Sequence, residues 1–154
     1  MKILNKILST ILIALVAIMI AVVTYHVTVK IVAEPSDWTD EFLRYSIIWL
    51  TMLGAPYAYG AGKHLSINIL TNSFSPRGKL IDKLVVEVLV LLLSVVVFVI
   101  GGVMVTVNAI GQYSASMHLP MQLYYVGVPI GGCLMVVYCI DHILGLAKEL
   151  KEGK

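Results

Sequence analysis

The sequence predicts an all-α integral membrane protein, a single domain over residues 1–154 with four transmembrane helices, both termini in the cytoplasm and short interfacial segments. Of the 154 residues, 59% are hydrophobic and 13% are charged, a composition that predicts no separate soluble domain. The apolar residues gather into four runs, at about 7–30, 42–61, 84–110 and 123–146. Each run is long enough to cross a hydrocarbon core, which takes about 20 helical residues.

The basic residues predict the orientation of these helices. Nine of the eleven Lys and Arg residues lie before the first run, between the second and third, or after the fourth: Lys2, Lys6, Lys63, Arg77, Lys79, Lys83, Lys148, Lys151 and Lys154. Cytoplasmic segments of membrane proteins retain such cations, so these three segments are expected in the cytoplasm. Because orientation accounts for the positive charge, the net charge of +2 does not indicate nucleic-acid binding.

The first two helices and the segments beside them follow from local signals. The first apolar run is longer than the 7–15 residues of a signal-peptide core and no Ala-x-Ala site follows it, so it is expected to stay as a helix. Ser36 or Asp37 can cap a new helix start. Residues 37–44 form either a short helix on the outer surface or the first turns of the second helix. Residues 62–76 mix apolar and polar side chains, which predicts an interfacial segment on the cytoplasmic side.

The third and fourth runs each contain ionisable groups about one turn from their cytoplasmic ends. Glu87 follows Lys83 by four residues, a spacing that predicts an ion pair on one helix face at the membrane interface. Asp141 and His142 are also expected at the interface. No carboxylate lies near the middle of a run, which argues against a proton- or drug-coupled carrier that acts alone.

No motif in the chain indicates catalysis, and no metal or other cofactor is expected. The sequence contains no HExxH, CxxC, GxSxG or phosphate-binding loop. An alternative function belongs to a different class, a haem-binding or structural membrane anchor subunit of a respiratory enzyme complex. Two histidines on facing helices can ligate haem, and His26 and His118 are both expected near the outer surface. His118, however, lies in a short loop beside Pro120 rather than within a helix.

Small residues recur at helical spacing on two of the predicted helices. Gly54, Ala58 and Gly62 follow one another every four residues on the second helix, and Gly127 and Gly131 flank Pro129 on the fourth. In lipid, close approach of helix backbones through small residues does much of the work of association. These rows therefore predict close helix contacts, either among the four helices or with another protein.

Two blocks of residues carry a resemblance to a known family. The first is Asp40-Glu41-x-x-Arg44-x-x-x-x-Trp49, followed by Gly54-Ala55 and Lys63-His64-Leu65-Ser66-Ile67. The second is Ser116-x-His118-Leu119-Pro120, leading into Tyr125-x-x-x-Pro129-Ile130-Gly131. With the four helices, the cytoplasmic N-terminus and the length, the chain resembles throughout the DctQ-like small membrane subunit of TRAP transporters, the tripartite ATP-independent periplasmic transporters of bacteria and archaea.

The resemblance implies a scaffold subunit in the bacterial inner membrane. In that family a large membrane subunit carries the substrate and sodium sites, and a periplasmic binding protein delivers a carboxylate such as a sialic acid or a C4-dicarboxylate. The large subunit is fused to the small one in some relatives and is expected here on a separate chain. Membrane lipids are the remaining partner.

The residues expected at the contacts with the partner proteins are Trp38, Asp40, Glu41, Arg44, Trp49, Gly54, Ala55, Ala58, His64, Tyr125, Pro129 and Gly131. Simpler roles stay open for several of them. Trp38 and Trp49 are alternatively anchors at the membrane–water interface. Glu41 and Arg44 are alternatively a local pair on one helix.

Overall fold

The described residues of the chain form four long helical segments arranged as two hairpins. The computed structural model describes residues 2–32, 37–61 and 76–151. The first hairpin consists of α1 (Lys2–Val32) and α2 (Asp37–Gly60). The outgoing segment of the second hairpin is α4 (Pro76–Leu93), the π-helix η1 (Ser94–Gly101) and α5 (Gly102–Asn108), and the returning segment is α6 (Met121–Tyr125) and α7 (Gly127–Lys151). No strand occurs in these ranges, where the only β-type pairing is an isolated bridge between Tyr113 and Pro120.

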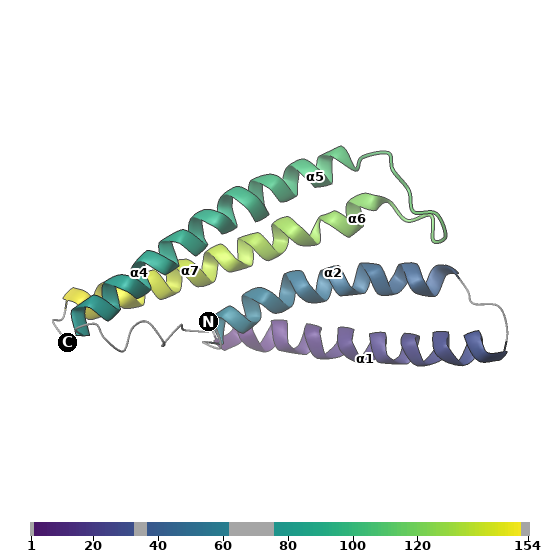
Figure 1. Ribbon diagram of the computed structural model, residues 1–154, viewed down its shortest axis with the longest axis horizontal. Helices are drawn as coiled ribbons and strands as arrows, with labels where there is room; N and C mark the ends of the chain where they lie inside the picture. The colour runs from purple at the N-terminus through teal and green to yellow at the C-terminus, as the bar shows by residue number, and fades with distance from the viewer. Residues whose placement is uncertain (1, 33–36, 62–75, 152–154) are drawn as a thin grey trace.

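The four segments lie side by side in one layer (Figure 1). Their order across the layer is α1, α2, α6–α7 and then α4–η1–α5. The two central segments, α2 and α7, run in the same direction and pack against each other. Both ends of the chain lie at one end of the layer, which we call the terminal end. The opposite end, where α2 begins and residues 109–120 connect α5 to α6, we call the loop end.

Within the part of the chain that the structure describes, three segments are long and apolar enough to cross a membrane: Ile3–Val32, Leu80–Asn108 and Met121–Leu150. Their large apolar side chains face outward, as Ile20, Leu89 and Leu144 show with more than half of their surface exposed. Such surfaces suit contact with lipid. α2 is the predicted span outside this group, because charged residues in its first turns and several tyrosines and glycines dilute its apolar residues.

Residues 37–44 are the first turns of α2, so of the two alternatives for this segment the structure shows the second. Asp37 and Asp40 occupy the first turn, where a carboxylate is favoured by the helix dipole. The predicted interfacial segment at 62–76 lies outside the described residues except for Pro76, where α4 begins.

The third and fourth helices are less regular than the apolar runs predict. The middle of the third is π-helical at η1. The fourth is divided at Val126, between α6 and α7. Pro129 has no N–H to donate to the carbonyl four residues earlier, at Tyr125, which is where α6 ends. The ring of Pro129 also lies against Gly102, where a Cβ would come within 2.8 Å of the proline Cδ.

Glycines on α7 determine how closely its neighbours approach. A Cβ at Gly131 would strike the backbone of Met52 on α2. A Cβ at Gly132, one residue on and about 100° around the helix, would lie 2.7 Å from the Cβ of Phe98 on η1. α7 therefore packs closely against a different neighbour on each side.

Candidate functional sites at the two ends of the layer

A cavity of about 430 Å³ opens at the loop end between α2 and the connection to α6. Its α2 side includes Asp37, Asp40 and Arg44. Tyr113 and Tyr125 contribute from the connection and from α6. We call it the loop-end cavity. It is an open, mixed-charge surface with aromatic walls.

Glu41 on α2 forms hydrogen bonds to the connecting segment that makes up one wall of this cavity. Its Oε2 accepts hydrogen bonds from the backbone N–H groups of Ser116, at 2.9 Å, and Met117, at 3.0 Å. A hydrogen bond from the Ser114 hydroxyl, together with these backbone bonds, lowers the pKa of the Glu41 carboxyl. Residues 113–120, which we call the 113–120 turn, are closed further by the bond from the Ser114 N–H to the Leu119 carbonyl. The carboxylate of Glu41 thus holds this turn, a role that its spacing from Arg44 does not reveal.

The first turns of α2 are also tied to α1. His26 on α1 contacts Thr39 through Nδ1, and its Nε2 lies 3.6 Å from the carboxylate of Asp40. Trp38 packs against Tyr25 on α1, with ring centroids 6.0 Å apart. Arg44 remains exposed at the cavity. Of the predicted outer-surface residues, Trp38 and Asp40 thus have contacts within the chain.

Trp49 and Gly131 join α2 to the returning segment of the second hairpin. The indole N–H of Trp49 donates to the Leu123 carbonyl at 3.1 Å. Its ring lies against Gly127, where a Cβ would be 3.5 Å away. Gly131 approaches Met52 on the same face of α2. The structure therefore uses these positions for packing within the chain.

The remaining predicted positions divide between the two hairpins. Gly54 faces Leu12 on α1, and a Cβ there would meet it at 3.9 Å. Ala55 and Ala58 are exposed on α2. Tyr125 lines the loop-end cavity and packs edge-on against Tyr124, while Pro129 meets Gly102. His64 and Gly62 lie outside the described residues.

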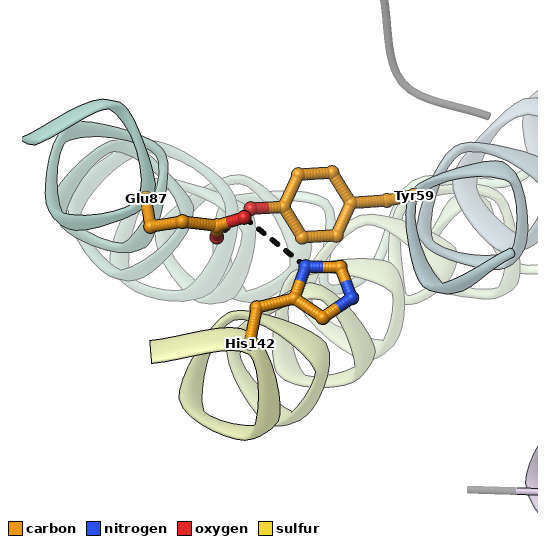
Figure 2. Close-up of polar contacts among 3 residues, drawn as sticks. All are labelled: Tyr59, Glu87 and His142. Carbon is orange, nitrogen blue, oxygen red and sulfur yellow. Dashed lines mark hydrogen bonds and ion pairs between the residues drawn. The ribbon is translucent and has the colours of Figure 1, made fainter. Parts of the chain in front are cut away.

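A second polar cluster lies within the layer toward the terminal end (Figure 2). Tyr59 on α2 donates its hydroxyl hydrogen bond to Oε2 of Glu87 on α4. Nδ1 of His142 on α7 is 3.1 Å from Oε1 of the same carboxylate. The prediction that Glu87 pairs with Lys83 on its own helix is replaced by these contacts to two other helices. The sequence contains one signal for this cluster: Tyr59, Glu87 and His142 are all predicted at similar distances along the membrane normal, near the cytoplasmic ends of their helices.

The two histidines of the haem-binding alternative, His26 and His118, lie in different kinds of structure. His26 contacts Thr39 and Asp40 at the start of α2. His118 is exposed in the 113–120 turn, with a φ of 54°. This geometry does not place the two imidazoles on facing helices.

Comparison with known proteins identifies the family. Residues 4–149 match the family described as tripartite ATP-independent periplasmic transporters, DctQ component. A protein of Haemophilus influenzae named as a TRAP transporter small permease is 26% identical over 116 residues, 75% of this chain and 71% of the relative. The sialic acid TRAP transporter small permease protein SiaQ of Vibrio cholerae is 25% identical over 150 residues, 97% of this chain and 86% of the relative.

A third relative extends the range of substrates named in the group. The C4-dicarboxylate TRAP transporter small permease protein DctQ of Rhodobacter capsulatus is 23% identical over 112 residues, 72% of this chain and 49% of the relative. The family match covers nearly the whole chain, including both helical hairpins. This chain belongs to the DctQ family of small permease subunits of TRAP transporters.

Proposed function

We propose that this chain is the scaffold subunit of a TRAP-type secondary transporter that imports a carboxylate, driven by a sodium gradient. It acts beside a large membrane subunit and a periplasmic binding protein. The family match over residues 4–149 carries this proposal. Relatives named for sialic acid and for C4-dicarboxylates support the substrate class.

We further propose four membrane spans with both termini in the cytoplasm of a bacterial inner membrane. α2 lies between two apolar spans, α1 and α7, and packs along both. Its 24 residues extend about 36 Å at 1.5 Å per residue, enough to cross with its neighbours. The cations near the terminal end, among them Lys6, Lys83 and Lys148, support a cytoplasmic position for that end.

Orientation is testable by labelling single cysteines from outside whole cells. Cys133 and Cys139 are first replaced by alanine. A cysteine at Ser116, whose side chain is exposed at the loop end, should react with a membrane-impermeant thiol reagent. A cysteine at Lys148 should react only after the membrane is opened. Labelling of the Lys148 position in intact cells would exclude this orientation.

The exposed face of α2 is the surface that we propose for the large subunit. Arg44, Thr51, Ala55 and Ala58 lie on this face at helical spacing and are exposed. α1 and the third helix expose mainly branched apolar side chains, whereas this face carries small and polar ones together with Ile47. Small residues let the backbone of a foreign helix approach closely, which is the contact that association in lipid needs.

Co-purification tests the scaffold role at this face. Ala58→Leu should reduce recovery of the large subunit with this chain, because the added side chain blocks close approach. Ala17→Leu makes the same change on the exposed face of α1 and should leave recovery unchanged. Equal recovery with both variants, each folded, would remove the α2 face from the proposal, and failure of the wild-type chain to recover any large subunit would remove the scaffold role itself.

The loop-end cavity is the surface that we propose for the periplasmic binding protein. Asp37, Asp40 and Arg44 are exposed at it, and in the proposed orientation it faces the periplasm. Charges on such a rim act mainly by steering encounter and fixing register. Glu41 contributes through the turn that it holds, and is not expected to contact the partner directly.

A further inference from the structure

The cluster of Tyr59, Glu87 and His142 takes no part in the proposed partner contacts. Its side chains are largely enclosed: Tyr59 is 2% exposed, and the Glu87 and His142 side chains are 16% and 31% exposed. Glu87 and His142 lie within candidate membrane spans, where an unpaired charge is costly. A carboxyl group and an imidazole can therefore both be charged at this position only if each compensates the charge of the other.

The cluster connects the two hairpins. α7 lies between α2 and α4 in the layer, and it packs on both. Tyr59 extends from α2 and Glu87 from α4 toward each other above α7, while His142 rises from α7 between them (Figure 2). The ring of Tyr59 also stacks on the imidazole, with centroids 5.1 Å apart and planes at 27°. One carboxylate thereby joins three helices.

The net charge of this cluster depends on how many protons Glu87 and His142 share. With one proton the pair is neutral overall, whether as carboxylate and imidazolium or as carboxylic acid and imidazole, and an N–H or O–H remains for their contact. Removing that proton leaves one negative charge, and adding another leaves one positive charge. Either charge is disfavoured in a poorly solvated position.

Among the side chains that the structure describes, those around the pair do not compensate for such a charge. Tyr59 faces it from α2, and Cys139 on α7 is buried beside the Tyr59 hydroxyl. Both are uncharged near neutral pH. On α4 itself, Lys83 lies one turn before Glu87 with its side chain exposed. The partial exposure of His142 gives protons a route to the pair.

We propose that Tyr59, Glu87 and His142 form a proton-sensitive latch between the two hairpins. It is closed when the Glu87–His142 pair carries one proton, and it loosens when the pair loses that proton or gains a second one. The inference concerns the chain alone and does not depend on which proteins it binds.

Distance measurements between the hairpins test the latch. Spin labels are placed on the exposed positions Ile20 of α1 and Leu92 of α4, at the two edges of the layer, in full-length protein with Cys133→Ala and Cys139→Ser. In lipid nanodiscs, the distance distribution should be narrowest at intermediate pH. It should broaden above about pH 8, where a carboxylate and an imidazole hold no proton between them, and again below about pH 4, where both groups are protonated.

Two single variants separate the arms of this response. In Glu87→Gln only the positive charge of the imidazolium can form, so the broadening at high pH should be lost. In His142→Gln only the negative charge of the carboxylate can form, so the broadening at low pH should be lost. The double variant should not respond to pH. Tyr59→Phe keeps the pair but removes the hydroxyl that reaches it from α2, and should broaden the distribution at every pH.

The outcomes are decisive in both directions. Loss of opposite arms in the two single variants would support the latch. A wild-type distribution that does not change with pH, or a pH response that persists in the double variant, would overturn it. If the double variant does not fold, the two single variants still decide, because identical pH profiles for both would contradict shared titration.

Discussion

Replacing Gly131 by alanine should push α2 and α7 apart. A methyl group at this position would point at the backbone of Met52, with the carbonyl carbon and Cβ both 3.1 Å away. Backbone atoms of a helix cannot rotate aside as a flexible side chain can, so the helices themselves must separate. The same change at Gly145, also on α7, meets nothing within 4 Å.

The expected magnitude follows from two opposing terms. Overpacking a close contact costs about 1–3 kcal/mol. Alanine in place of glycine within a helix returns about 0.5–1 kcal/mol. Gly145→Ala should therefore stabilise the protein by roughly the second amount alone, because glycine and alanine differ there only in backbone entropy. The free energies of unfolding of the two variants should differ by about 1–3 kcal/mol, the overpacking cost.

Reversible unfolding in mixed micelles, titrated with sodium dodecyl sulfate and followed by circular dichroism and Trp fluorescence, measures this difference. The chain is purified alone, so that a lost contact with a partner cannot contribute. Equal free energies of unfolding for Gly131→Ala and Gly145→Ala would show that α2 and α7 do not approach as the structure describes. A large loss in both variants would instead show that α7 tolerates no side chain at either position, which would equally refute the reasoning.

Three further predictions concern the loop end and the alternative function. Because the pKa of Glu41 is lowered, its hydrogen bonds stabilise the 113–120 turn fully above the ordinary carboxyl range and weaken as the pH falls through the lowered pKa. Backbone amide exchange at Ser116 and Met117, corrected for intrinsic rates, should therefore accelerate on acidification. Glu41→Gln should remove this acid dependence, and an unchanged profile in the variant would contradict the assignment. Arg44→Glu should reduce uptake by the reconstituted transporter more strongly at low than at high ionic strength, whereas uptake equal to wild type at both would exclude electrostatic docking there. Purified protein should show no Soret absorption; a stoichiometric haem spectrum would restore the respiratory-anchor alternative.

Hydropathy and short motifs were sufficient to locate the helical segments and to indicate the family. Hydropathy located the helical segments, because burial in lipid requires long continuous apolar runs whatever their neighbours. The apolar runs did not predict the division between α6 and α7, although Pro129 supplies a local cause for it through its missing N–H. The motifs around Arg44 and His118 indicated the DctQ family, which the match over residues 4–149 confirms.

The contacts between helices could not be predicted from residues that are neighbours in the sequence. Trp49 donates to Leu123, 74 positions along the chain, and Glu41 binds the N–H of Ser116, 75 positions away. From spacing alone Glu41 was equally suited to pair with Arg44, and Glu87 with Lys83, because i to i+3 and i to i+4 neighbours are the partners that a sequence displays.

The sequence by itself determined which segments are helical, which ends carry the cations, and to which family the chain belongs. Each of these depends on residues close together in the chain. Only the tertiary structure decided that the helices form one layer with α2 and α7 at its centre, that Gly131 serves internal packing while Ala58 stays exposed, and that Glu87 joins three helices. The physical reason is that small residues and lone ionisable groups look alike on every helix until close packing selects which face meets which neighbour.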